Sequence, residues 1–203
     1  MSARLSLFVA SSNPGKLREY AELSLGTPVT TEPLPFFQEI PPFDESAPTF
    51  AENSAGKALH YSRHTDGLVL ADDSGLVVPA LGGAPGVLSA RYAGPEASDA
   101  DRIRKLLGEM EGKKRTERSA RFVCITTIAR EGKALIVASD FAEGILAKAP
   151  RGTNGFGYDP IFYIPSLERT YAELPSAQKD QLSHRGKAFR KAVSLLAGRD
   201  FAF

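Results

Sequence analysis

The sequence predicts one α/β domain over residues 1–203, in which helices flank a mixed β-sheet. Apolar runs at 5–10 and 121–129 have the length and composition of buried strands. Helix starts with capping residues lie between such runs, and each is followed by residues of helical period. In the middle of the chain, strand-like runs are joined by a short turn. That pattern indicates antiparallel neighbours, so we expect a mixed sheet rather than a regular βαβ array.

The composition excludes several classes of partner. The 203 residues can bury the core of one well-packed domain, and 25 Lys and Arg against 24 Asp and Glu give a net charge of +1. Without a basic excess, neither a nucleic acid nor a membrane is expected as a partner. The single cysteine, Cys124, lies in an apolar run. It predicts a buried, inert thiol and a reducing, cytoplasmic location.

The first strand, 5–10, leads into a polar turn and a helix expected over Pro14–Leu25. Asn13 suits the N-cap, and Pro14 suits the first helical position. Backbone N–H groups at such a helix start can bind an anion, and Lys16 can reach a phosphate. The turn lacks the Walker sequence. A capped helix with a solvated lysine therefore explains these residues equally well.

Two acids, Asp44 and Glu45, stand in an irregular, proline-rich stretch ahead of the next helix. That helix begins with the capping box Thr49–Glu52. Asn53 and Lys57 share one of its faces, which is directed either to a cleft or to water. The face expected to pack on the sheet consists of small residues: Ala51, Ala55, Ala58, Leu59 and Ser62.

Asp72 and Asp73 lie between two apolar runs, 68–71 and 76–78. Adjacent carboxylates between buried segments are costly unless a metal, a hydrogen-bond network or a catalytic task requires them. The alternative is an ordinary polar turn between two strands, because Asp and Gly are common turn residues. The following segment, Gly82–Gly86, is expected to form a tight structural turn without a catalytic role.

The remaining elements follow the same alternation. Ser98–Asp101 predicts a capped helix, 111–119 an exposed charged loop, and Ser183–Ala197 the last helix. Strands are expected at 121–129, 133–139, 141–146 and 161–164.

Two features of the C-terminal third suit a ligand. The loop Gly152–Pro160 interleaves glycines with Phe156 and Tyr158, which allows backbone approach to a planar ligand and stacking on it. A hairpin loop with its aromatic rings in the core fits equally well. Lys179 and His184–Arg185 form either a basic surface turn or a reader of base carbonyl or phosphate oxygens.

Together these features suit a magnesium-bound polyphosphate that carries a planar base. Mg²⁺ binds through one or two carboxylates plus substrate phosphates and keeps several waters. Such a metal can activate water and neutralise charge on a phosphorus centre under attack.

Six segments, in order and over almost the whole chain, carry a family resemblance: Ser11–Lys16, Thr49–Asn53 with Lys57, Ala71–Leu76, Gly82–Gly86 with Ser89–Tyr92, Gly155–Pro160 and Ser183–Gly186. Jointly they resemble the inosine triphosphate pyrophosphatase family. The resemblance implies hydrolysis of noncanonical purine nucleoside triphosphates (ITP, dITP and XTP) to the monophosphate and pyrophosphate, with Mg²⁺ as cofactor. It also implies an elongated mixed sheet, two lobes with the active-site cleft between them, and a homodimer.

The resemblance further implies roles for individual residues. Asp73 matches the catalytic acid and a metal ligand, and Asp44 matches a second metal ligand. The family often has Glu-Glu where this chain has Asp44-Glu45, so Glu45 is the alternative, and the role of Asp72 stays open. Substrate-binding positions are matched by Ser11, Ser12, Asn13, Pro14, Gly15, Lys16, Lys57, Ser74, Phe156, Gly157, Tyr158, Asp159, Lys179, His184 and Arg185.

The lysines and the first turn fall at triphosphate positions, and the aromatic loop and the His-Arg pair fall near the base. A second departure from the family is Asn154, where glycine is common. The mechanistic hypothesis is attack of magnesium-activated water on the α-phosphorus. Three alternatives remain: a house-cleaning pyrophosphatase for other modified nucleotides, a nucleotide-binding protein without turnover, and a structural domain without a ligand.

Overall fold

The computed structural model describes residues 4–198, which fall into two compact units. Unit 1 consists of residues 4–73, 124–140 and 185–198, and unit 2 consists of residues 74–123 and 141–184. One domain over residues 1–203 stays a prediction. None of the described helices is long and apolar enough to cross a membrane.

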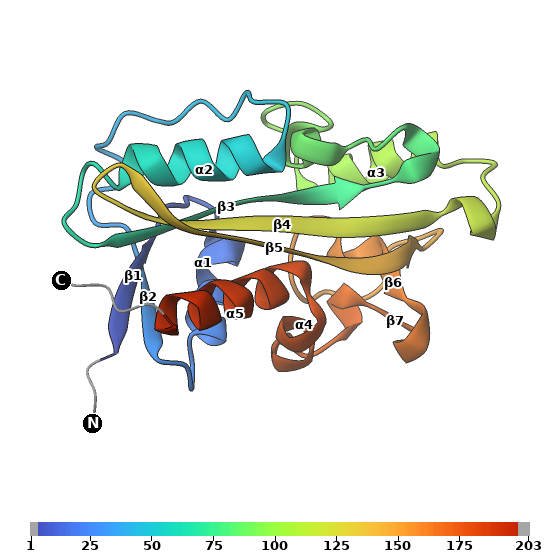
Figure 1. Cartoon of the computed structure of the whole chain (residues 1–203). Helices are drawn as coiled ribbons and strands as arrows, with labels where there is room; N and C mark the ends of the chain where they lie inside the picture. The colour runs from blue at the N-terminus through green and yellow to red at the C-terminus, as the bar shows by residue number, and fades with distance from the viewer. Residues whose placement is uncertain (1–3, 199–203) are drawn as a thin grey trace. The chain divides into compact units, whose positions relative to one another are not determined.

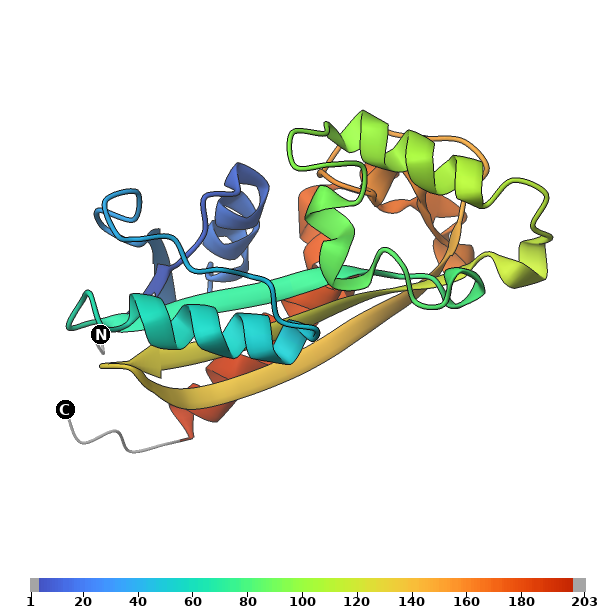
Figure 2. The same ribbon diagram turned by 90° about the horizontal axis from the view of Figure 1, so that it is seen from above.

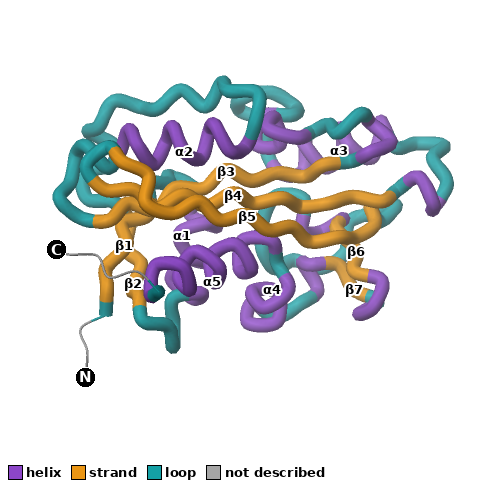
Figure 3. The backbone as a smooth tube through the Cα atoms, viewed as in Figure 1, coloured by secondary structure: helices purple, strands orange, loops and turns teal. Residues whose placement is uncertain are grey.

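Among residues 4–198, seven strands form one sheet: β1 (Leu5–Val9), β2 (Val29–Pro33), β3 (Leu68–Val77), β4 (Ser119–Arg130), β5 (Lys133–Leu146), β6 (Phe162–Ile164) and β7 (Arg169–Thr170). Five α-helices accompany them in this part of the chain: α1 (Pro14–Leu23), α2 (Phe50–Tyr61), α3 (Asp99–Glu109), α4 (Ser176–Leu182) and α5 (His184–Ala197). Figure 3 shows both sets.

The sheet is mixed, with strand order β2-β1-β3-β4-β5-β6-β7. β1 pairs in parallel with β2 and with β3, whereas β6 pairs antiparallel with β5 and with β7. The predicted α/β class, with helices flanking a mixed sheet, is confirmed.

In unit 1, helices cover both faces of the strands (Figures 1 and 2). Successive side chains of a strand point to opposite faces. Leu70 of β3 accordingly packs in one cluster with Tyr20 of α1 and Phe189 of α5. Its neighbour Val69 packs in a different cluster with Ala58 of α2. α1 and α5 therefore share one face of β3, and α2 covers the other.

Unit 2 has an apolar core of its own. Leu106 of α3, Phe162 of β6 and Tyr171 are fully buried in one cluster. The rings of Phe162 and Tyr171 lie 4.9 Å apart. The predicted cap of α3 is present as a capping box: Ser98 Oγ accepts a hydrogen bond from Asp101 N at 3.2 Å, and Asp101 Oδ2 accepts one from Ser98 N at 3.1 Å.

Several predicted boundaries are wrong. Asp72–Gly75 is not a turn but the middle of the continuous strand β3. The strands expected at 133–139 and 141–146 are one strand, β5, because the alternation of buried and exposed residues continues through Asp140. Arg118, expected in an exposed loop, is buried because its guanidinium donates to three main-chain carbonyls. Helix α4 was not predicted, whereas the last helix, α5, was predicted correctly.

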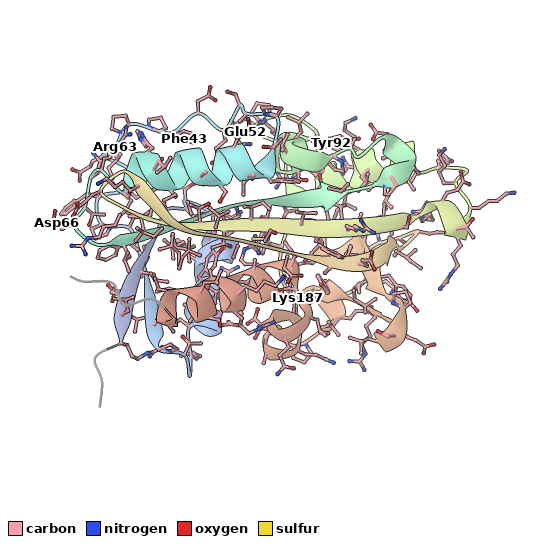
Figure 4. The ribbon with its side chains drawn as sticks, viewed as in Figure 1. Phe43, Glu52, Arg63, Asp66, Tyr92 and Lys187 are labelled. Atoms are coloured by element: carbon pink, nitrogen blue, oxygen red, sulfur yellow. The ribbon has the colours of Figure 1, made fainter. Side chains whose placement is uncertain are left out.

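The face that helix α2 buries overlaps only in part with the predicted one, because Ala58 and Ser62 are buried as expected but other predicted positions are not. Thr49 caps it as expected, and Thr49 Oγ1 accepts a hydrogen bond from Glu52 N at 3.2 Å. Ala51 is exposed, however. The ring of Phe43, which is labelled beside α2 in Figure 4, lies against Gly56. The prediction failed at the polar positions: Asn53 is buried against Asp73, and Lys57 is buried in an ion pair with Glu45. The buried positions are Asn53, Ser54, Lys57, Ala58 and Tyr61.

Cys124 is fully buried in β4, as predicted. Burial raises the pKa of its thiol to about 12, and the nearby Asp72 carboxylate adds to that rise. We therefore expect no reaction of the native thiol with DTNB at pH 8, since only the thiolate attacks. After unfolding in guanidinium, one equivalent of chromophore should be released, because the chain has one cysteine. Release from the native protein within minutes would contradict this prediction.

Candidate active site

The carboxylates of Asp72 and Asp73 lie in the middle of β3, where neighbouring side chains point to opposite faces. Asp72 shares the face of Leu70, toward α1 and α5, and Asp73 shares the face toward α2. Both residues are buried, with 1% and 8% of their surface exposed. Although adjacent in sequence, the two acids therefore have separate environments.

Asp72 is a buried counter-ion. Its carboxylate lies 2.9 Å from Lys16 Nζ and 3.4 Å from Arg185 Nη2. The buried Arg185 guanidinium also donates to Glu19 of α1. Burial alone would raise the pKa of Asp72, but the charges of Lys16 and Arg185 hold that pKa well below its usual range. Asp72 is therefore anionic throughout the neutral pH range.

The pKa of Asp73 moves in the opposite direction. It is raised chiefly because burial disfavours the charged carboxylate. The charges of Lys16 and Lys57 lower this pKa, and the charge of Glu45 raises it. Asn53 Nδ2 donates to Asp73 Oδ2 at 3.0 Å and so orients the carboxylate. A carboxylate of raised pKa, held in one orientation, has the properties of a general base.

The two acids ahead of α2 differ in their surroundings. Glu45 is half-buried, and its carboxylate lies 3.0 Å from Lys57 Nζ. Asp44 is exposed and accepts a hydrogen bond from Ser46 Oγ at 2.7 Å. Within residues 4–198 no three His, Cys, Asp or Glu side chains form a cluster that could hold a metal by itself. Asp44 as a metal ligand stays a prediction, and Glu45 is the acid whose charge acts on Asp73.

The turn after β1 forms the predicted helix start. Asn13 Oδ1 accepts hydrogen bonds from Gly15 N at 2.8 Å and from Lys16 N at 3.1 Å. Ser11 Oγ accepts from Asn13 N at 3.1 Å, and Ser12 is exposed. Asn13 thus caps two of the amides that the sequence analysis offered to an anion. Phosphate binding by this turn stays a prediction.

In unit 2, the glycine-aromatic loop folds around the carboxylate of Asp159. Its Oδ2 accepts a hydrogen bond from Phe156 N at 2.9 Å, and the carboxylate forms a buried ion pair with Lys179. Gly155 has a φ of 74°, and a Cβ there would lie 2.0 Å from Asp159 Oδ2, so glycine is required. Asn154, in place of the common glycine, donates through its side chain to a main-chain carbonyl at 3.0 Å.

Two contacts hold the middle of this loop. Gly157 N donates to Asp99 Oδ2 at 2.7 Å, and Tyr158 Oη donates to the carbonyl of Ser89 at 2.9 Å. Ser89 Oγ in turn accepts from Leu76 N, near the end of β3, at 2.9 Å. Ser89, which follows the predicted turn Gly82–Gly86, thus links the loop to the end of β3. This contact gives the segment Ser89–Tyr92 a structural role that the sequence alone does not reveal.

The remaining predicted substrate residues are divided between the two units. His184 lies in unit 2, is 5% exposed, and stacks on the ring of Phe122 with centroids 4.6 Å apart. Arg185 lies in unit 1, in the ion-pair network of Asp72. Ser74 is half-buried in β3. Contact of these side chains with a substrate stays a prediction.

Two residues that contact this site, Glu19 and Asn53, have no role in the sequence-based prediction. Glu19 lies three residues after Lys16 on α1, and this i,i+3 spacing of opposite charges was an available signal. Asn53 lies four residues before Lys57, but the sequence cannot decide whether their shared face meets a cleft or water. Asn53 and Lys57 are both buried, and Asn53 contacts Asp73, so this face is not directed to bulk water.

We expect Asp72→Asn and Asp73→Asn to differ in stability. Asp72→Asn should lower the free energy of unfolding by about 3 kcal/mol at pH 7, because it removes the buried negative charge that faces Lys16 and Arg185. Asp73→Asn should leave it unchanged or raise it. A folded-state pKa above the unfolded value means that ionisation at pH 7 opposes folding, a cost that disappears only as the pH falls below the unfolded pKa.

Urea unfolding, followed by circular dichroism, measures the free energy of unfolding of both variants and of the wild type. Asp66→Asn, at an exposed turn (Figure 4), is the matched control. Equal losses in the two variants would overturn the assignment of separate environments.

Known proteins share this sequence and fold. The model of the Ham1 family matches residues 7–195. The dITP/XTP pyrophosphatase of Geobacillus kaustophilus is 47% identical over 185 residues, which are 91% of each chain. That of Coxiella burnetii is 43% identical over 194 residues, which are 95% of this chain and 96% of the relative.

Solved structures agree with these relatives. A HAM1 protein from Coxiella burnetii has a TM-score of 0.84 at 42% identity, over 96% of this chain and 100% of that one. The Ham1 protein of Staphylococcus aureus has a TM-score of 0.81 at 38% identity, with the same coverage. The resemblance carried by the six sequence motifs is therefore confirmed, and the chain belongs to the Ham1 family.

Proposed function

We propose that this chain hydrolyses noncanonical purine nucleoside triphosphates, namely ITP, dITP and XTP, to the nucleoside monophosphate and pyrophosphate, and so removes them from the nucleotide pool. The observation that carries the proposal is Asp73, a buried carboxylate of raised pKa on which two lysines act. Relatives named dITP/XTP pyrophosphatase, 47% and 42% identical to this chain, support a hydrolase that acts on triphosphate anhydrides.

Three lysines supply positive charge for the triphosphate. Each ammonium group is already paired with an acid: Lys16 with Asp72, Lys57 with Glu45, and Lys179 with Asp159. An ordered ammonium group loses less conformational freedom when a phosphate binds. This preorganisation supports their assignment to the phosphates.

The base is assigned to Phe156–Asp159 and to His184 and Arg185. A 6-keto purine accepts a hydrogen bond where adenine presents a donor. A site rich in N–H donors therefore leaves those donors unpaired with ATP, and unpaired buried groups discriminate strongly. The side chains of His184 and Arg185 carry N–H donors of this kind.

The donor set near Asp73 fits Mg²⁺. Carboxylate oxygens are the hard ligands that this ion prefers, and one or two suffice beside substrate phosphates. Asp73 would be one ligand, and Asp44 or Glu45 the second. Glu45 is half-buried beside Lys57, whereas Asp44 is exposed, and this difference supports Glu45. When bound, the ion supplies charge neutralisation and lowers the pKa of a coordinated water.

The chain's own residues then carry the hydrolysis. Asp73 accepts the proton of the attacking water, and Asn53 keeps the carboxylate in its orientation. A bond forms between the water oxygen and the α-phosphorus. The bond between the α-phosphorus and the oxygen that bridges it to the β-phosphorus breaks, and pyrophosphate leaves. The three lysines stabilise the negative charge that develops on the leaving pyrophosphate.

We also propose that the protein is a cytoplasmic homodimer, as the family resemblance implies.

Pyrophosphate release from ITP, dITP, XTP, ATP, GTP and a modified pyrimidine triphosphate, with and without Mg²⁺, tests the function. We expect Asp73→Asn to lower kcat for ITP roughly a thousandfold, because a general base contributes a factor of that order. Asp66→Asn should retain full activity. Near-normal turnover by a folded Asp73→Asn protein would refute the acid assignment, and equal kcat/KM for ATP and ITP would refute the base assignment.

The second metal ligand can be tested with Glu45→Gln and Asp44→Asn. We expect Glu45→Gln to raise the Mg²⁺ concentration needed for half-maximal activity roughly tenfold, the loss typical when a group that supports a metal site is removed. Asp44→Asn should change it less than twofold. Isothermal titration with Mn²⁺ and no substrate provides a second readout. The reverse order would restore Asp44 as the ligand.

A further inference from the structure

We propose that Asp99 is a positioning residue for the loop Gly155–Asp159 and thereby sets purine specificity. We call this segment the base loop. The inference rests on the function proposed above, because it takes the base loop as the part that reads the purine. None of the six sequence motifs contains Asp99.

The first step is the contact itself. Asp99 is the first residue of α3, and its Oδ2 accepts a hydrogen bond from Gly157 N at 2.7 Å. Gly157 has a φ of 61°, in the left-handed region that glycine adopts without strain. A hydrogen bond to an ionised acceptor is about twice as strong as a neutral one. The carboxylate therefore fixes the peptide plane at the middle of the base loop.

The second step is that the carboxylate is itself held. Arg102, one turn later on α3, donates to Asp99 Oδ1. The same guanidinium donates to the carbonyls of Ala90 at 2.6 Å and Ala97 at 2.9 Å. One carboxylate oxygen thus takes the arginine, and the other remains directed at Gly157. The base loop is tied through Asp99 to a helix rather than to another loop.

The third step concerns the neighbouring anchors. Tyr158 is held by the carbonyl of Ser89, and Asp159 by Lys179, but both contacts use side chains of the base loop itself. The contact of Asp99 instead ends on a backbone amide of the loop, so it can be removed without altering a loop side chain. Without it, part of the ordering cost of the loop would fall on substrate binding. The chemical step, assigned to Asp73, would be unaffected.

The competing explanation is that Asp99 only stabilises α3, because acids in the first helical turn interact favourably with the helix dipole. Asp101 provides the matched control. It lies in the same first turn, is an acid of the same length, and its hydrogen bonds go to Ser98 and Arg104. A purely helical role predicts similar results for Asp99→Ala and Asp101→Ala.

Hydrogen–deuterium exchange of the peptide that covers residues 155–160 tests the anchor without reference to activity. We expect roughly tenfold faster exchange in Asp99→Ala and no change in Asp101→Ala. Equal exchange in both variants would refute the anchor.

Steady-state kinetics tests the consequence for specificity. We expect Asp99→Ala to raise KM for ITP roughly tenfold, the factor that corresponds to one hydrogen bond to a charged group. Its kcat should stay within twofold, and the ratio of kcat/KM for ITP to that for ATP should fall. Asp99→Asn keeps a carbonyl oxygen that can accept from Gly157 N. Its KM for ITP should therefore lie close to the wild-type value. Asp101→Ala should behave as wild type.

The outcomes separate this inference from the function on which it rests. Faster exchange with unchanged KM would refute the specificity role and leave the proposed function intact. A loss in kcat rather than KM would mean that Asp99 acts on the chemistry, which also refutes the inference. A wild-type protein without ITP hydrolysis would refute the proposed function and the specificity role with it, whereas the anchor would still be decided by the exchange measurement.

Discussion

The unit 1 site depends on the extended backbone at Asp72 and Asp73. Because a strand sends neighbouring side chains to opposite faces, two acids that share a peptide bond receive different partners. One is neutralised by Lys16 and Arg185, and the other has a raised pKa beside Asn53. If both carboxylates shared one face, their mutual repulsion would raise the pKa of at least one of them.

Buried ion pairs position the elements of unit 1 more than they stabilise them. Glu19 and Lys16 of α1, Arg185 of α5 and Asp72 of β3 alternate in charge. The desolvation of such groups offsets most of their attraction, so their net contribution to stability is small, but breaking one pair is costly. The network therefore fixes where Lys16 stands relative to β3. Because Lys16 also lowers the pKa of Asp73, the same network tunes the candidate base.

Features encoded locally could be predicted from the sequence, and those that depend on partners in space could not. The helix caps at Asn13, Thr49 and Ser98 were predicted correctly, because a cap and its helix lie within a few residues. The Asp72–Gly75 segment was misread, since Asp, Ser and Gly favour turns and only burial on both faces holds them in a strand. The buried face of α2 was predicted only in part, because Asn53 and Lys57 are buried by partners that lie elsewhere in the sequence.

The candidate site divides along the same line. Motif residues such as Asp73 and Lys57 can be proposed from sequence because a family pattern marks them, whereas roles for Asn53 and Asp99 can be proposed only from the three-dimensional structure. In the sequence, Asp99 is fully explained by the helix that it begins, since an acid in a first turn requires no other reason. Only the contact of one carboxylate oxygen with Gly157 and of the other with Arg102 gives it a second role. A residue that satisfies a local rule can thus conceal a long-range one, and its second partner is what distinguishes Asp99 from Asp101.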